Sequence, residues 1–207
     1  MARPANPDIR ARLREQAIDY VLERGFAAVT LRPMAKELKT NARMLVYHFG
    51  SREGLIREIL VGLRQREDAV IRQWFQKKKT PPTLADFLRW YWRRMSAPQA
   101  RPAALLIFEL YALALRDPDS YPGVLTDPIA YWRGLAVKAG ARRYADAQAT
   151  LLLAATRGLL LDLTATNQRV RIDRAVKLLA ELIDEKTTRR QSTMQNKAHA
   201  KRNKSSE

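Results

Sequence analysis

Cysteine is absent from this chain of 207 residues, and histidine occurs only at positions 48 and 199. The missing thiols exclude disulfides and thiolate chemistry, and a structural zinc site would have too few of its usual ligands. The sequence also lacks a phosphate-cradling glycine loop, a pair of catalytic carboxylates and any triad setting around His48 or His199. We therefore expect no metal, no cofactor and no enzymatic activity.

Acidic residues are scarce relative to basic ones. The chain has 38 Lys and Arg against 21 Asp and Glu, a formal charge of +17 and a pI near 10.7. The positive electrostatic field of such a protein attracts phosphates over a Debye length. The charge also extends into residues 187–207, which hold six basic residues and one acidic residue. We predict a basic, disordered tail there, either as a plain solvated segment or as non-specific help in holding DNA.

Long uninterrupted apolar runs are missing as well. The N-terminal stretch MARPANPDIRARL has no signal-peptide core, and Arg157 and Asp162 interrupt the longest apolar segments well short of a membrane span. We expect a cytoplasmic protein without membrane contact. A hydrophobic content of 46% is enough for one substantial core and a small satellite domain.

What the chain does contain is a compact pattern in residues 30–57: two short helices, a tight turn and a helix restart. Thr30 is suited to cap a first helix, whose apolar positions recur at helical spacing through Leu38. Lys39 and Thr40 form the turn, and Asn41 is a good N-cap for the next helix. This arrangement is typical of a helix-turn-helix DNA reader.

The second helix of the pattern, residues 42–47, is predicted to present one face outward. Leu45 faces inward, and the residues expected to face out are Ala42, Arg43, Met44 and Tyr47. Side chains in such positions can reach base edges or phosphates. Gly50 then ends the helix, and Ser51 with Glu53 begins a long amphipathic one.

These residues resemble the DNA-binding domain of the tetracycline-repressor (TetR) family of bacterial regulators. The resemblance rests on the segments AKEL (35–38), YHF (47–49) and SRE (51–53), together with a preceding helix that ends at Gly25. The chain differs from the usual pattern in carrying Lys39 where the family has Gly and Arg43 where many members have a small residue. The resemblance implies an N-terminal reader followed by a larger all-helical part.

By this resemblance, two groups of residues contact DNA. Phosphates are held by Thr30, Thr40, Tyr47, His48 and Arg52, whereas Ala42, Arg43 and Met44 meet base edges, with Asn41 at the start of the recognition helix. We therefore expect a double-stranded DNA operator as the partner.

The rest of the sequence predicts an all-α chain with no convincing strand. We divide it into a helix-turn-helix domain (1–55), a helical ligand-binding and dimerisation domain (56–186) and the basic tail (187–207). Residues 77–82, KKKTPP, break the long fourth helix and mark the change of domain, although that helix belongs to both. The irregular segment 117–128 is a candidate flap over a cavity.

The last two predicted helices, about 144–166 and 172–186, carry more apolar surface than one neighbour needs. Ile172, Val176, Leu179 and Ile183 form one row, and Ala175, Leu178 and Leu182 form an adjacent one. In the TetR family, the two C-terminal helices of each subunit build a four-helix dimer interface. We expect a homodimer through Leu159, Leu163, Ala175, Leu178 and Leu182; the alternative is that both rows serve the intrachain core.

Aromatic residues cluster in the middle of the chain. Family members bind a small molecule between such helices, and ligand pockets are generally apolar and aromatic. The candidate ligand-binding residues are Phe87, Trp90, Tyr91, Phe108, Tyr111 and Trp132, with Glu109 or Arg157 as a charged partner. Plain core packing is the competing interpretation for each aromatic residue.

The function we expect is a ligand-responsive transcriptional regulator. It would be a repressor that binds a palindromic operator as a homodimer and is released by a small apolar or aromatic effector. The alternative is a basic helical protein that coats DNA or a membrane surface without reading sequence. That alternative rests on net charge alone and leaves the ordered motif of residues 30–53 unexplained.

Overall fold

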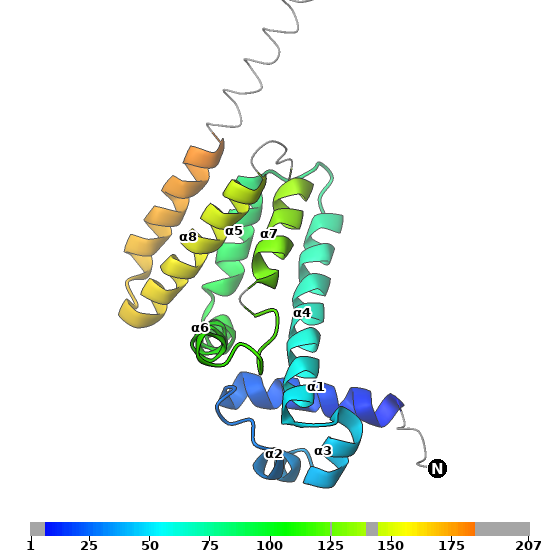
Figure 1. Cartoon of the computed structure of the whole chain (residues 1–207). Coiled ribbons are helices and arrows are strands. Elements are labelled where there is room, and N and C mark those ends of the chain that lie inside the picture. Colours follow the sequence, from blue (N-terminus) through cyan, green and yellow to red (C-terminus); the bar gives the residue numbers. More distant parts are fainter. Residues whose placement is uncertain (1–6, 125, 140–144, 185–207) are drawn as a thin grey trace, which may run out of the picture. The chain divides into compact units, whose positions relative to one another are not determined.

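The computed structural model describes residues 7–124, 126–139 and 145–184, and these are helical with connecting turns (Figure 1). The helices are α1 (Pro7–Arg24), α2 (Leu31–Glu37), α3 (Ala42–Phe49), α4 (Arg52–Gln76), α5 (Leu84–Met95), α6 (Arg101–Arg116), α7 (Asp127–Lys138), α8 (Ala145–Thr166) and a further helix at 169–184. The all-α fold class predicted from the sequence is confirmed.

The chain divides into two compact units, each with its own packing. Unit 1 comprises Met1–Lys79 and Pro98–Tyr131, and unit 2 comprises Thr80–Ala97 and Trp132–Glu207. The expected boundary at residue 55 does not coincide with this division, because α4 is one unbroken helix of 25 residues and α6 packs with the N-terminal helices. The predicted tail at 187–207 lies outside the described residues.

Unit 1 is built around the crossing of α1 and α4, with α2 and α3 on the far side of α1 from most of α4 (Figure 1). Its core side chains are fully buried and come from each of these elements: Ile18, Phe26, Met34, Leu45, Leu55 and Ile59. Gly62 allows the close crossing, since a Cβ there would lie 2.3 Å from Ile18 Cδ1. These residues belong to one hydrophobic cluster under the helix-turn-helix motif.

Helix α6 completes the unit-1 core. Leu106 and Ala114 on α6 and Tyr121 beyond it are buried with the N-terminal residues, and the Tyr121 ring meets Phe26 edge-on at 6.2 Å between centroids. A helix outside the helix-turn-helix motif is thus part of the same hydrophobic cluster.

Unit 2 packs α5, the rest of α7, α8 and the helix at 169–184. Thr83 and Asp86 form a reciprocal capping box at the start of α5. Two polar contacts fasten α5 to the last helix: Trp92 Nε1 donates to Asp173 Oδ1 at 2.7 Å, and Arg89 Nη2 donates to Asp184 Oδ2 at 2.7 Å.

Candidate nucleic-acid interface

Helix α3 has the orientation that its sequence pattern predicts. Asn41 Oδ1 accepts a hydrogen bond from the Met44 amide at 2.9 Å, which caps the helix, and Leu45 is fully buried. Arg43 is exposed, and Tyr47 is 45% exposed. Ala42 and Met44 are half-buried. The outward face of α3 thus presents the guanidinium of Arg43 and the phenol of Tyr47, and both groups are able to contact bases or phosphates.

The turn before α3 holds Thr40, one of the predicted phosphate-binding residues, and Thr30, another, precedes α2. Thr40 is half-buried, and its amide donates to the carbonyl of Ala35 at 2.9 Å. Lys39 has φ +51°, in the left-handed region, which costs a non-glycine residue roughly 1–2 kcal/mol. Thr30 stands at the N-cap of α2 but makes no capping hydrogen bond with its side chain, so the predicted cap is positional only.

His48 does not lie on the outward face. Its side chain is 7% exposed, and its ring packs edge-on against Tyr47 at 5.1 Å and tilted against Phe49 at 6.3 Å. Neither ring nitrogen has a hydrogen-bond partner among the described residues. Because the helix turns this position toward the core, a phosphate contact by His48 remains a prediction that the unbound geometry does not favour.

Arg52 has a structural contact already. Its Nε donates to the carbonyl of Val29 at 2.7 Å, which ties the start of α4 to the segment before α2. At the same helix start, Ser51 Oγ accepts from the Gly54 amide, and hydrogen bonds from the backbone and from Ser51 lower the pKa of Glu53. A phosphate contact by Arg52 therefore stays a prediction and would have to share the guanidinium with Val29.

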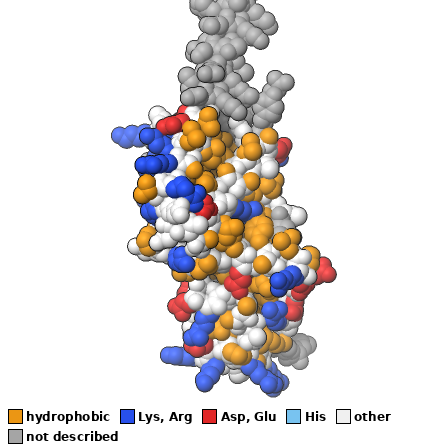
Figure 2. Space-filling view, turned by 90° about the vertical axis from the view of Figure 1, so that its left-hand side faces the viewer, with side chains coloured by type: hydrophobic (Ala, Val, Ile, Leu, Met, Phe, Trp, Pro, Cys, Tyr) orange, Lys and Arg blue, Asp and Glu red, His pale blue; other side chains and the backbone are white. Residues whose placement is uncertain are grey.

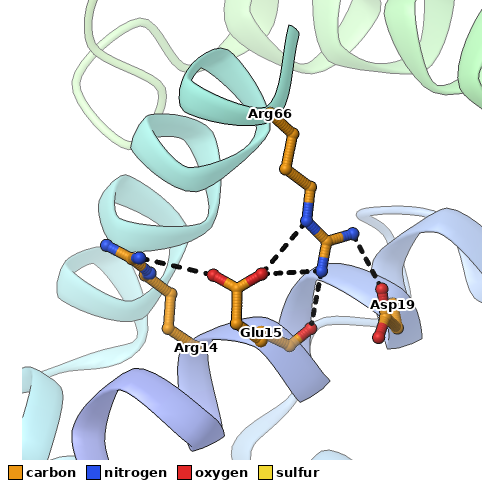
Figure 3. A network of polar contacts seen from close by, with 4 residues as sticks. All are labelled: Arg14, Glu15, Asp19 and Arg66. Atoms are coloured by element: carbon orange, nitrogen blue, oxygen red, sulfur yellow. Dashed lines mark hydrogen bonds and ion pairs between the residues drawn. The ribbon is translucent and has the colours of Figure 1, made fainter. Parts of the chain in front are cut away.

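An ion-pair network fixes α1 against α4 (Figure 3). Arg66 on α4 points to two carboxylates of α1, with Nη2 2.8 Å from Glu15 Oε2 and Nη1 2.8 Å from Asp19 Oδ1. Arg14 approaches the other Glu15 oxygen at 3.3 Å. Burial lowers the pKa of Arg66, but these carboxylates outweigh it and the net shift is upward. No local sequence pattern indicates this ion-pair network, because Arg66 and Glu15 are 51 positions apart.

Glu109 is not placed as the charged partner of a ligand. Its carboxylate accepts hydrogen bonds from the backbone amides of Phe26 at 2.9 Å and Ala27 at 2.7 Å. Gly25 has φ +81°, and a Cβ there would lie 2.6 Å from Glu109 Oε2, so this turn requires glycine for both reasons. Glu109 is the only acidic residue of α6, and this isolation in an apolar helix was the sequence signal for a special role. The sequence could not reveal its partners, because they are backbone amides.

The candidate ligand-binding aromatics fall into both units. Within unit 2, the ring of fully buried Phe87 lies 5.8 Å from Trp90, 5.7 Å from Tyr91 and 5.6 Å from Trp132. Phe108 and Tyr111 belong to α6 of unit 1 and are half-buried. The structure thus brings four of the six together, and ligand contact by any of them remains a prediction.

The two apolar rows of the last helix have different environments. In the first row, Ile172 and Val176 are buried inside unit 2, and Leu179 and Ile183 are half-buried. In the second row, Leu178 is 57% exposed, Leu182 is 48% exposed and Ala175 is exposed. In Figure 2, hydrophobic side chains lie open over this helix pair. Leu159 and Leu163 on α8 are half-buried.

Helix α8 also leaves an apolar row in solvent. Its exposed positions recur at the alternating spacing of four and three residues that is typical of a helix seam, and they are Ala147, Leu151, Ala154, Gly158, Leu161 and Ala165. Leu151 is 69% exposed, and a Cβ on Gly158 would meet nothing within 4 Å. No charged residue belongs to this row. At the turn that follows, Asp162 accepts from Arg171 at 2.7 Å, and this contact lowers the Asp162 pKa.

The same helix corrects one sequence expectation. Among the described residues, α8 alone is long and apolar enough to cross a membrane, with a mean hydropathy of 1.3 over an 18-residue window that is 33% buried. Arg157 and Asp162 do not keep it short of a span, because two charges among many Leu and Ala residues leave the mean high. Core helices of soluble proteins pass this test too, so the absence of membrane contact remains a prediction.

Comparison with known proteins agrees with this geometry. Residues 13–59 match the family model of bacterial regulatory proteins, tetR family. Among solved structures, Salmonella enterica GusR is 24% identical with a TM-score of 0.60, over 88% of this chain and 100% of that one. The multidrug binding protein EbrR complexed with imidazole is 24% identical with a TM-score of 0.65, over 88% and 94% of the two chains.

A further similar structure is a Saccharomonospora viridis protein in complex with choline, 22% identical with a TM-score of 0.58, over 86% of this chain and 97% of that one. No curated protein sequence matches the chain. The capped α3, with Leu45 buried and Arg43 and Tyr47 exposed, is the second helix of the helix-turn-helix in the segment that matches the family model. Residues 13–59 are therefore a DNA-binding domain of the tetR family of bacterial regulatory proteins, and the similar solved structures share the fold of the longer chain.

Proposed function

We propose that this regulator is a repressor that binds a palindromic operator as a homodimer and leaves it when a small apolar or aromatic effector binds. The observation that carries the proposal is the exposed apolar row Ala175, Leu178 and Leu182, beside the uncharged row of α8. A second copy of the same surface would bury both rows. A twofold dimer presents two copies of α3 to successive major grooves, roughly 34–36 Å apart.

The helices that bear this surface are held firmly enough to act as an interface. Asp162 with Arg171 joins the end of α8 to the last helix, and Trp92 with Asp173 joins the last helix to α5. Burying a half-exposed leucine stabilises an assembly by about 1 kcal/mol, so several leucines per subunit give a substantial total. We infer that the four C-terminal helices of two subunits form the dimer contact.

The proposed link between effector and reader runs through α6. Phe108 and Tyr111 lie on α6 on either side of Glu109, whose carboxylate holds the Phe26 and Ala27 amides just before α2. A ligand that displaces α6 would pull on this turn. Releasing most of the bound repressor requires several kcal/mol of differential affinity, so the effector has to make extensive contacts.

The aromatic residues indicate the chemical class of the effector. Four rings gather in unit 2, and aromatic faces favour flat apolar or aromatic molecules. EbrR, which shares the fold, is named a multidrug binding protein and is known in complex with proflavin. This supports a small aromatic effector for the present chain.

Selection of bound DNA from a random pool tests the operator proposal. We expect an enriched palindrome with half-sites one helical turn apart, bound by a particle that light scattering identifies as a dimer. Equal binding of selected and unselected duplexes at the same salt would support the DNA-coating alternative instead. Stronger binding to anionic vesicles than to any duplex would indicate the membrane-surface alternative.

The effector proposal is tested with Trp90→Ala and Tyr111→Ala. We expect both variants to bind the selected operator nearly as well as wild type but to need more of an aromatic effector for release. Tryptophan fluorescence during a small-molecule screen supplies the effector, and operator release is then titrated. Variants that respond as well as wild type, or that lose their helical signal, would assign these rings to packing.

A further inference from the structure

The turn between α2 and α3 has an unusual residue at its most restricted position. Lys39 has φ +51°, its amide donates to the Lys36 carbonyl at 3.2 Å, and the Thr40 amide donates to Ala35 at 2.9 Å. These paired bonds are the Schellman motif, whose left-handed position normally holds glycine. Here that position holds a lysine.

Elsewhere, the described chain follows the usual preference at left-handed positions. Gly25, Gly50 and Gly123 have φ between +78° and +81°, and Asn167, at the turn after α8, has φ +55°. Glycine and asparagine adopt this conformation readily, whereas lysine does so at a cost. The backbone conformation of the turn therefore does not explain why a lysine occupies this position. The explanation has to come from the lysine side chain.

The Lys39 side chain is exposed and has no ion-pair partner among the described residues. The acidic residue nearest to it in sequence, Glu37, is already paired with Arg24 at 3.2 Å. No ion pair among the described residues therefore accounts for the Lys39 ammonium. Lys39 lies two residues before Asn41, the N-cap of α3. It therefore precedes the N-terminal end of the helix that bears the exposed Arg43.

We propose that Lys39 is a phosphate-anchoring residue of the reader, whose ammonium binds the DNA backbone beside the N-terminus of α3. This inference rests on the DNA-binding role of α3. A lysine ammonium is a mobile point charge without base preference, so its contribution would fix the position of the helix and not the choice of sequence. The strained turn is then retained because it directs this charge toward the duplex.

The test compares variants of the full-length protein on two probes, a duplex selected from a random pool and an unselected duplex of the same length. Lys39→Gly removes both the charge and the strain. We expect its melting temperature to equal or exceed that of wild type, while affinity for both duplexes falls about threefold to tenfold. The slope of log affinity against log salt should become shallower by about 0.9, the value for one phosphate contact.

Three further variants separate charge from backbone. Lys39→Arg keeps the charge and should retain the wild-type salt slope, whereas Lys39→Gln keeps the strain and should lose affinity as Lys39→Gly does. Lys138→Gln, at the exposed end of α7, is the matched control for loss of one positive charge and should change neither measurement by more than the error.

Unchanged affinity and salt slope in both Lys39→Gly and Lys39→Gln would overturn the proposal and leave Lys39 as a plain turn residue. A loss confined to the selected duplex would also overturn it, since that result identifies a base contact. If wild type itself bound neither duplex in a salt-dependent way, the DNA-binding role would fail together with this inference. Normal wild-type binding with unaltered variants rejects the inference alone.

Discussion

The recognition helix α3 and the last helix, 169–184, each bury one row of side chains, but they leave different chemistry in solvent. On α3 the buried positions are Leu45, His48 and Phe49, and the exposed ones include Arg43 and Tyr47. The last helix buries Ile172, Val176 and Ala180 but exposes the apolar residues Leu178 and Leu182. The surface of α3 already suits water and DNA, whereas that of the last helix lacks a covering partner.

The difference separates two kinds of binding energy. A charged face such as that of α3 attracts phosphates from a distance and loses affinity as salt rises. An apolar face gains free energy only when a complementary surface removes it from water, and this gain depends little on salt. Operator affinity and dimer stability should therefore respond differently to salt and to mutation.

The largest expected effect comes from a charge placed on the exposed apolar row. Leu178→Glu buries an unpaired carboxylate in the proposed dimer at a cost of several kcal/mol but leaves it in water in the monomer. Light scattering should show a helical monomer with much weaker operator binding. A variant that stays dimeric at micromolar concentration would place the interface elsewhere.

The buried row of the same helix supplies a contrast for this experiment. Val176→Glu places its charge inside unit 2, so circular dichroism should show loss of structure rather than dissociation into folded monomers. Lys177→Glu adds a carboxylate where the wild-type side chain is 77% exposed and should leave the dimer intact. If Leu178→Glu unfolded like Val176→Glu, Leu178 would belong to the intrachain core.

The second effect concerns Glu109. Its removal in Glu109→Ala leaves the amides of Phe26 and Ala27 without their carboxylate partner and should lower the free energy of unfolding by about 2–3 kcal/mol. Thermal unfolding measures this loss. Glu109→Gln keeps one acceptor oxygen and should lose less, while Asp119→Asn, an exposed change in the same unit, is the control.

The same variants test coupling to an effector. If α6 transmits effector binding through Glu109, Glu109→Gln should weaken the effect of ligand on operator release more than it weakens operator binding itself. Equal operator release by Glu109→Gln and wild type at every effector concentration would confine Glu109 to a structural role.

The sequence predicted the reader well because its information is local. Helix caps such as Asn41 and Ser51, the inward Leu45 and the glycine at the end of α1 depend on neighbours a few residues away, and the structure confirms each of them. The two apolar rows of the last helix also follow from helical periodicity, although periodicity does not indicate which row the subunit buries.

The sequence was less informative about contacts between distant segments. Glu109 binds backbone amides 82 and 83 positions away, and Arg66 reaches Glu15 across 51 positions, so no local spacing indicates either contact. His48 was assigned from a motif, but whether its ring faces out depends on how α3 packs against α4. Thr30 shows that a residue can occupy a capping position without making the capping bond.

A third and smaller effect sharpens the interpretation of α3. Arg43→Ala should cost about 1–3 kcal/mol of operator affinity and relax the preference at one base position, because an exposed guanidinium on this face can bond a base edge. Binding to a library of single-base operator variants measures both quantities. Arg32→Ala, at an exposed position of α2, is the control: it should change operator affinity at most, and not base preference. If Arg43→Ala also left base preference unchanged, Arg43 would not be a base-reading residue.

The smallest expected effect is also the most selective for the apolar face of α8. Gly158 lies on the exposed row, and an added methyl group meets nothing within the described subunit. If α8 faced only water, Gly158→Ala would stabilise the helix by about 1 kcal/mol through its higher helix propensity. In a dimer where Gly158 allows close approach of the partner helix, the same methyl group should instead weaken association.

Gly134→Ala on α7, where the added methyl group also meets nothing, is the matched control and should stabilise the protein in either case. Melting temperatures measured over a range of protein concentrations separate the outcomes, because an effect on association depends on concentration and an effect on helix propensity does not. A concentration-independent gain in both variants would show that α8 presents Gly158 to solvent, and the interface would then be limited to the last helix.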